Sequence, residues 1–102
     1  MSTLATVSTH VLDVAAGKPA SGVRVTLGTR TAMTDDSGRI ADLSGGGINP
    51  GTYRLLFEVG PYFAGAPHLF ETVTLEVQLG EGGHYHVPLL ISPFSCSSYR
   101  GA

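Results

Sequence analysis

Hydrophobic and polar positions alternate along most of this chain with a period of two, which is typical of β-strands half-buried in a sheet. Fourteen glycines and six prolines separate the alternating runs and predict turns between them. The runs that we interpret as strands are residues 4–13, 23–27, 53–59, 70–79, 84–92 and 95–100. Residues 61–65 are predicted to hold one helical turn. The pattern therefore predicts an all-β protein, a two-sheet β-sandwich of about seven or eight strands with one short helix.

The length of 102 residues predicts a single domain, residues 1–102. Charged residues make up only 14% of the chain, against a usual share of about 25%. A domain of this size has much surface for its volume. We therefore expect part of its apolar surface to be covered by other subunits. The net charge is −2 and the six basic residues are scattered, which excludes a nucleic-acid-binding patch.

The cysteine content and the hydrophobic runs bear on the location of the protein. Cys96 is the only cysteine, which excludes an internal disulfide and fits a reducing compartment. The N-terminus lacks a secretory signal, and no apolar run approaches the roughly 20 residues needed to cross a bilayer. We therefore expect a cytoplasmic protein with no membrane partner. Cys96 has the opposite parity to Ser97 and Tyr99, and we expect it to pack as a small hydrophobic residue.

Three histidines fall on the same face of the predicted strands. His10 in the first run, and His84 and His86 in the last long run, lie on the face opposite the predicted core. The same face carries apolar side chains that require cover, namely those of Leu12, Pro88 and Leu90. Because imidazole titrates near neutral pH, histidines on a covered apolar face are candidates for acid–base catalysis.

Other interpretations stay open on the pattern alone. Solvated or interface histidines are the more frequent explanation of such a pattern, and His68, which lies in a loop, is predicted to be solvated. The three outward histidines could bind a metal, but a zinc site needs three or four converging ligands and no carboxylate has a suitable spacing. We expect no metal and no cofactor. The pattern by itself assigns no function to Arg39 or Arg100, and no motif of a covalent nucleophile is present.

Several motifs of the chain, taken together and in order, resemble those of the 5-hydroxyisourate hydrolases, the enzymes related to transthyretin. The motifs are S-T-H-V-L-D at residues 8–13, G-K-P-A at 17–20, G-V-R-V at 22–25, T-D-D-S-G-R at 34–39, G-T-Y-R-L at 51–55, Y-F at 62–63, H-Y-H-V-P-L-L at 84–90 and Y-R-G at 99–101. The resemblance therefore covers nearly the whole chain.

The resemblance implies a transthyretin-like (prealbumin-like) sandwich of two four-stranded sheets. It also implies a homotetramer, a dimer of dimers, with the active sites in the channel between the dimers. The implied catalytic residues are His10, Arg39 and His86. The implied substrate-binding residues are those of the tail, Tyr99, Arg100, Gly101 and Ala102. The chain departs from the family pattern at Ala102, where serine is usual, and at Cys96 and Ser98.

The activity that the resemblance implies belongs to purine catabolism, the degradation of urate. The enzyme is a hydrolase that acts on a cyclic amide C–N bond and opens 5-hydroxyisourate to 2-oxo-4-hydroxy-4-carboxy-5-ureidoimidazoline. Water attack is assisted by histidine and arginine, without a cofactor. Either His10 or His86 is expected to be the base, and Arg39 orients one of them or stabilises the oxyanion. The alternatives are a hydrolase of another cyclic ureide, and a transthyretin-like module that binds a small molecule or a protein.

Overall fold

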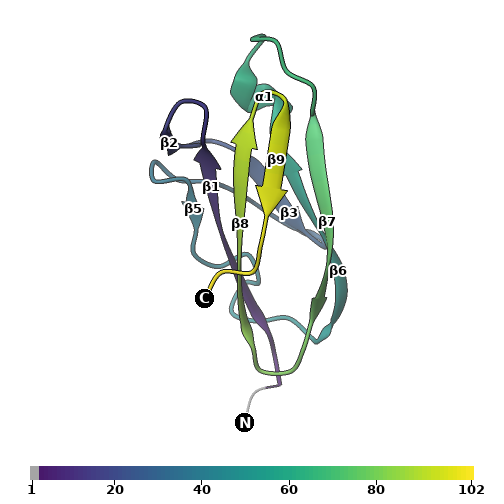
Figure 1. Cartoon of the computed structure of the whole chain (residues 1–102). Coiled ribbons are helices and arrows are strands. Elements are labelled where there is room, and N and C mark those ends of the chain that lie inside the picture. Colours follow the sequence, from purple (N-terminus) through teal and green to yellow (C-terminus); the bar gives the residue numbers. More distant parts are fainter. Residues whose placement is uncertain (1–2) are drawn as a thin grey trace.

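In the computed structural model, which describes residues 3–102, two β-sheets pack face to face as a sandwich (Figure 1). The elements within these residues are β1 (Thr6–Asp13), β2 (Lys18–Pro19), β3 (Arg24–Leu27), β4 (Arg30–Met33), β5 (Arg39–Ile40), β6 (Gly51–Glu58), α1 (Gly60–Phe63), β7 (Thr72–Leu79), β8 (His84–Ser92) and β9 (Ser95–Ser98). One sheet has the order β2-β1-β8-β9, and β5 also pairs with β1. The other has the order β4-β3-β6-β7.

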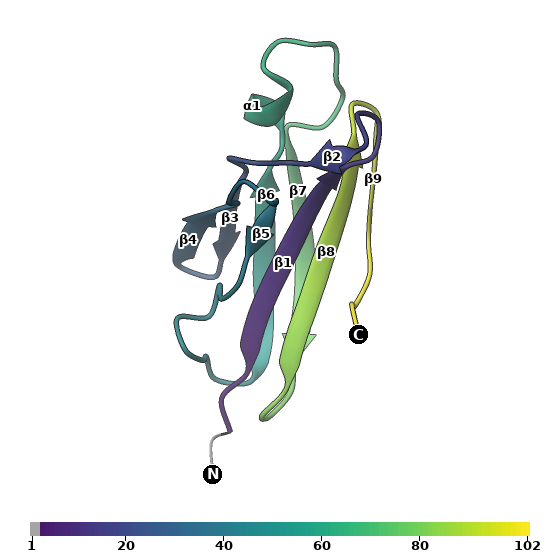
Figure 2. The same ribbon diagram turned by 90° about the vertical axis from the view of Figure 1, so that its left-hand side faces the viewer.

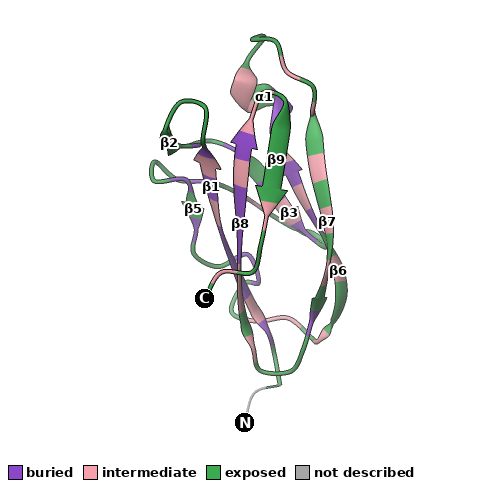
Figure 3. Ribbon diagram, in the orientation of Figure 1, coloured by how far each residue is buried: buried purple, intermediate pink, exposed green. Residues whose placement is uncertain are grey.

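The core lies between the two sheets, as the alternation predicts. Val7 and Val11 of β1 and Leu89 of β8 are fully buried, and they share one core cluster with Leu55 and Phe57 of β6. Buried and more exposed positions alternate along β6 and along β1 from Thr9 onward, whereas the outward-facing Ser8 of β1 is also buried (Figure 3). Each buried side chain of this size contributes about 1.5–3 kcal/mol relative to an exposed one. The core therefore fixes which face of β1 and β8 points outward, and so where their histidines lie.

Strand β1 is held on both sides by other strands. It runs parallel to β8 over its whole length, from Thr6 opposite His84 to Asp13 opposite Ile91. Figure 2 shows the two strands side by side. On its other side β1 pairs antiparallel with β5, where His10 stands opposite Arg39. The backbone that carries His10 is therefore fixed from both directions.

A tight turn delivers the chain into β5. The carboxylate of Asp35 accepts hydrogen bonds from the backbone N–H groups of Ser37, at 2.9 Å, and Arg39, at 3.0 Å. The bond from the Arg39 N–H, followed by that from the Ser37 hydroxyl, lowers the pKa of Asp35 below its usual value. Gly38 has a φ of +79°, and a Cβ there would lie 2.4 Å from the carbonyl oxygen of Val11. Only glycine fits this turn, which sets the position of Arg39.

The structure confirms the predicted sandwich and adds short strands to it. Strands β2, β4 and β5 were not predicted, and residues 3–102 form nine strands rather than seven or eight. Two of the three contain only two residues, which is too short for a period-two pattern to be read. Strand β9 ends at Ser98 rather than at residue 100. The predicted helical turn is confirmed as α1, four residues long.

One packing prediction is wrong. Cys96 is exposed rather than packed as a small hydrophobic residue. It lies on β9, the edge strand of its sheet, which has a neighbouring strand on one side only. The first two residues of the predicted domain lie outside the described part of the chain. Within residues 3–102, no helix is long and apolar enough to span a membrane.

Candidate active site

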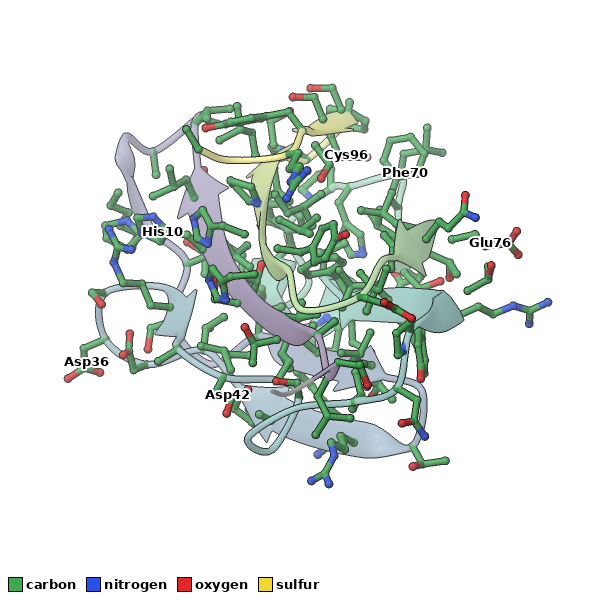
Figure 4. The ribbon with its side chains drawn as sticks, turned by 90° about the horizontal axis from the view of Figure 1, so that it is seen from below. His10, Asp36, Asp42, Phe70, Glu76 and Cys96 are labelled. Carbon is green, nitrogen blue, oxygen red and sulfur yellow. The ribbon has the colours of Figure 1, made fainter. Side chains whose placement is uncertain are left out.

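The pairing of β1 with β5 and β8 gathers the predicted catalytic residues on one sheet. His10 stands opposite Arg39 of β5, and two residues back along β1, Ser8 stands opposite His86 of β8. His10 and His86 are both half-buried, and Arg39 is exposed. Figure 4 shows His10 beside β1, on the side away from the second sheet. The three side chains come from segments far apart in the sequence and occupy neighbouring positions of one outer face.

The ring of His10 has a defined tautomer. Its Nε2 lies 2.8 Å from the carbonyl oxygen of Ser37, in the turn before β5. A carbonyl oxygen can only accept a hydrogen bond, so Nε2 is the nitrogen that carries the proton. When the ring is neutral, Nδ1 therefore holds the lone pair. The turn that places Arg39 thus also orients His10.

His86 is kept neutral by its surroundings. Burial lowers the pKa of His86 below the ordinary value of 6.5, and the positive charge of Arg39, then His10 and His84, lowers it further. The Nδ1 atom of His86 lies 2.8 Å from the hydroxyl oxygen of Ser8. A neutral imidazole with a low pKa has a free lone pair at neutral pH, which suits a group that accepts a proton.

Ser8 is a residue of this site that the sequence did not single out. Its side chain is nearly buried, at 8% exposure, and its hydroxyl contacts both histidines of β8: Nδ1 of His86 and, at 3.0 Å, Nε2 of His84. The sequence indicated only that Ser8, two residues before His10, lies on the same face of the strand. The parallel pairing of β1 with β8, which makes Ser8 the partner of His86, could not be derived from the alternation.

The tail lies along β8 and reaches His86 with its backbone. The N–H of Gly101 donates a 2.7 Å hydrogen bond to the carbonyl oxygen of His86. A Cβ at Gly101 would lie 2.6 Å from Cδ2 of the His86 ring, so a side chain does not fit there without displacing the ring. Tyr99 is 57% exposed, and Ala102 is exposed as well. The tail thus borders the site through Gly101.

Arg100 lies apart from the three predicted catalytic side chains within this chain. Its guanidinium carbon is 4.4 Å from the centre of the Tyr85 ring, and its Nη2 donates a long 3.4 Å bond to the His84 carbonyl oxygen. Arg100 and Tyr85 line a cavity of about 420 Å³ between β7 and the beginning of β8, together with the inward-facing Leu75, Val77 and Leu79. The structure therefore places the Arg100 side chain on the inner side of the sheet, with the Tyr85 ring as its neighbour.

His68 is half-buried and hydrogen-bonded within its loop, whereas a solvated side chain was predicted. Its ring stacks on Phe63 of α1 with 5.5 Å between ring centres, and Nδ1 donates a 2.7 Å bond to the carbonyl oxygen of Ala66. Its Nε2 contacts the carboxylate of Glu71. The carbonyl of Ala66, followed by Glu71, raises the pKa of His68 above its ordinary value. These contacts tie the loop between α1 and β7 together, away from β1.

In residues 3–102, the structure brings no three histidine, cysteine, aspartate or glutamate side chains into an arrangement that could hold a metal ion. The outward histidines of β1 and β8 instead contact hydroxyl and carbonyl groups of the chain. The chemistry available on this face is therefore that of imidazole, guanidinium and hydroxyl groups.

Comparison with known proteins assigns the family. The chain belongs to the HIUase/Transthyretin family, whose model matches residues 7–101. It is 45% identical to a 5-hydroxyisourate hydrolase of Deinococcus radiodurans, over 93% of this chain and 94% of that protein. The fold matches the structure of Klebsiella pneumoniae 5-hydroxyisourate hydrolase with a TM-score of 0.87, at 36% identity, covering 96% of this chain and 94% of the other.

The same fold is shared with a transthyretin. Transthyretin from Sparus aurata matches with a TM-score of 0.86, at 27% identity, covering 93% of this chain and 95% of that one. The fold therefore does not separate the enzymes from the transthyretins of this family, and the residues of the site have to do so.

Proposed function

We propose that this chain is a 5-hydroxyisourate hydrolase, an enzyme that acts on a cyclic amide C–N bond. The observation that carries the proposal is the convergence of Arg39, His10 and His86 on one face through the pairing of β5, β1 and β8. The resemblance to the family's motifs implies a catalytic role for these residues, and relatives named for this activity match nearly the whole chain.

The groups on this face suit the two proton transfers that the reaction needs. A water molecule loses a proton to an imidazole as its oxygen bonds to the ring carbonyl carbon, and the Arg39 guanidinium stabilises the oxyanion. The C–N bond then breaks, and the leaving nitrogen takes a proton from an imidazole. The product is 2-oxo-4-hydroxy-4-carboxy-5-ureidoimidazoline. The low pKa of His86 keeps that ring available as a base at neutral pH, and the scheme needs no cofactor.

The tail residues Tyr99, Arg100, Gly101 and Ala102 are proposed to bind the substrate. The Gly101 hydrogen bond to His86 places this segment beside the catalytic face. Arg100 has to leave the Tyr85 ring to take part with its guanidinium. A cation–π contact at an exposed site is worth only about 0.5–1 kcal/mol, so a substrate that accepts two hydrogen bonds from the guanidinium can compete with it.

The active assembly is proposed to be a homotetramer, a dimer of dimers, in the cytoplasm. Leu12 and Leu90, on the same face as the catalytic side chains, remain partly exposed in the single chain, and charged residues are few. A second pair of subunits over this face would cover these apolar side chains and enclose the site. Sedimentation equilibrium at micromolar concentration tests this proposal, and a monomer would contradict it.

The activity has a direct test. Freshly made urate oxidation product decays spontaneously, and the ultraviolet absorbance of 5-hydroxyisourate reports its loss. Addition of the protein should accelerate this decay in proportion to protein concentration. Decay at the spontaneous rate, with folded protein present, would contradict the proposed function.

The second candidate is a transthyretin-like binding module, which the likeness to Sparus aurata transthyretin favours. A carrier of large aromatic ligands needs a deep apolar site, whereas this face carries histidines and an arginine. We expect no tight binding of large iodinated aromatics by calorimetry. Tight binding, together with no acceleration of 5-hydroxyisourate decay, would favour the carrier.

A further inference from the structure

A row of four hydrogen-bonded side chains runs along the outer face of β1 and β8 and ends at His86. Thr6 Oγ1 lies 2.7 Å from Nδ1 of His84, and Nε2 of His84 lies 3.0 Å from the hydroxyl of Ser8. The same hydroxyl lies 2.8 Å from Nδ1 of His86. The parallel register produces this row, because it places Thr6 opposite His84 and Ser8 opposite His86. The row uses both ring nitrogens of His84 and Nδ1 of His86. Nε2 of His86 is the one ring nitrogen that takes no part in the row.

We propose that Ser8 and His84 form a proton relay that serves His86 during catalysis. The proposal deepens the hydrolase function and rests on it. Ser8 and His84 act through His86, so they are positioning and relay residues.

The proton count of the row defines its resting state. The Ser8 hydroxyl has one hydrogen and lies between two ring nitrogens, so it donates to one ring and accepts from the other. If His86 is to take a proton from water, its Nε2 must hold a lone pair and its Nδ1–H must donate to Ser8. Ser8 then donates to Nε2 of His84, and Nδ1–H of His84 donates to Thr6. All three hydrogen bonds are satisfied while both rings are neutral.

The relay step moves two protons and no electrons between residues. His86 Nε2 takes a proton from the attacking water, Nδ1 of His86 passes its proton to the Ser8 oxygen, and Ser8 passes its own hydrogen to Nε2 of His84. His86 is then neutral with a proton on Nε2, and the positive charge resides on His84. When the C–N bond breaks, His86 gives the Nε2 proton to the leaving nitrogen and the two transfers reverse. The carbonyl carbon has then gained the hydroxyl of water, and the leaving nitrogen has gained its proton.

The surroundings of the row favour this direction of charge movement. The charged and titratable groups that act on His86 are Arg39 from β5, His10 from β1 and His84 from β8 itself. Arg39 stands opposite His10, which lies four residues along β1 from Thr6, the residue opposite His84. His84 is also exposed, whereas His86 is half-buried. A positive charge is therefore better hydrated on His84 and further from the Arg39 guanidinium than it would be on His86. The Arg100 guanidinium also lies near His84, but it contacts the backbone carbonyl of His84 and the Tyr85 ring on the inner side of the sheet.

A purely orienting role for Ser8 is the alternative, and two substitutions separate the two roles. In Ser8→Ala both the orientation of the His86 ring and the path to His84 are lost. In His84→Gln the amide oxygen can still accept the Ser8 hydrogen, so His86 keeps its tautomer, but an amide does not store a proton. The relay predicts that both variants lose activity, whereas simple orientation predicts that His84→Gln keeps it.

The kinetic test uses the full-length protein and 5-hydroxyisourate. Ser8→Ala and His84→Gln should each lower kcat about tenfold with little change in KM, less than the roughly hundredfold minimum for removing a direct proton-transfer group. The double variant should be no slower than Ser8→Ala, because the two residues act as a unit. Ser8→Thr, which restores the hydroxyl, should regain most of the rate. Ser92→Ala is the matched control, since it removes a hydroxyl of β8 whose hydrogen bonds within residues 3–102 are to Ser95.

A second readout needs no substrate and therefore survives failure of the hydrolase proposal. Nitrogen-15 spectra of the neutral His86 ring should show the proton on Nδ1 in the wild type and in His84→Gln, and on Nε2 in Ser8→Ala. A His86 proton on Nε2 in the wild type overturns the proposed resting state. Unchanged kcat in His84→Gln, in an active enzyme, overturns the relay. A wild type that does not accelerate substrate decay contradicts the hydrolase function itself.

Discussion

His86 and His68 lie in environments that shift the pKa of the same side chain in opposite directions. The ring of His86 is half-buried, contacts a hydroxyl that can donate or accept, and lies near the positive charge of Arg39. The ring of His68 contacts a backbone carbonyl and the carboxylate of Glu71, which both accept hydrogen bonds from the ring. The first environment lowers the pKa and the second raises it. Burial and the nearby positive charge stabilise the neutral form of His86, whereas the two acceptors stabilise the protonated form of His68.

The two regions also differ in how the backbone holds the ring. His86 lies in β8, which pairs with β1 on one side and with β9 and the tail on the other. His68 lies in a loop, and its position depends on Phe63, Ala66 and Glu71 close by in the sequence. A strand fixed on both sides can hold a catalytic group to within the small displacement that catalysis tolerates. The loop contacts are local and serve the loop itself.

The largest expected effect comes from substitutions on the outer face of β1, β5 and β8, which leave the loop around His68 unchanged. His10→Asn, His86→Asn and Arg39→Lys should each lower turnover of 5-hydroxyisourate by about two orders of magnitude or more, the usual scale for acid–base groups. Far-ultraviolet circular dichroism should be unchanged, because all three residues lie outside the core cluster.

His68→Asn is the matched control for these variants, because it removes an imidazole from the other region. Its turnover should equal that of the wild type in the same absorbance assay. If His68→Asn lowered turnover strongly while His86→Asn did not, the assignment of the catalytic face would be wrong.

A nearly as large effect is expected from deletion of residues 99–102. The deletion removes the Gly101 hydrogen bond to His86 and the side chains of Tyr99 and Arg100, but it removes no member of the core cluster. The protein should stay folded by circular dichroism and lose most of its activity. Unimpaired turnover would restrict the site to His10, Arg39 and His86.

The acid limb of the activity profile measures the electrostatics of His86. Burial and then the charge of Arg39 hold the pKa of His86 below 6.5, so the neutral base persists below that pH. Arg39→Gln removes a positive charge, which raises the pKa of His86 and should move the acid limb of the residual activity to higher pH. Arg39→Lys keeps the charge and should leave the limb near its wild-type position. If the acid limbs of the two variants lay at the same pH, the charge of Arg39 would not contribute to this pKa.

The smallest expected effect concerns the loop region and stability rather than activity. The pKa of His68 is raised in the folded state, so its protonated ring contributes stability that is fully present below pH 6.5 and is lost as pH rises through the folded pKa. Glu71→Gln should therefore lower Tm slightly at mildly acidic pH and have no effect at alkaline pH. A Tm difference that grew with pH would contradict the sign of this linkage.

Much of the fold could be predicted from the sequence because strand alternation is a local property. The positions of Val7 and Val11 in the core, and of His10 and His86 on the outer face, follow from the period of two. Strands of two residues, such as β2 and β5, could not be predicted because they contain no full period. The environment of His68 could not be predicted either, because a loop has no periodicity from which contacts can be read.

The sequence by itself determined the alternation, which depends on neighbouring residues, and the order of motifs that marks the family. Only the tertiary structure decided that β1 pairs in parallel with β8, in a register that places Ser8 between His84 and His86. These partners are 76 and 78 residues apart in the chain. Which distant strands pair, and in what register, depends on how the whole core packs. A shift of the β8 register by one residue would turn His84 and His86 toward the core. The hydrogen-bonded row exists because the packing of the core excludes that shift.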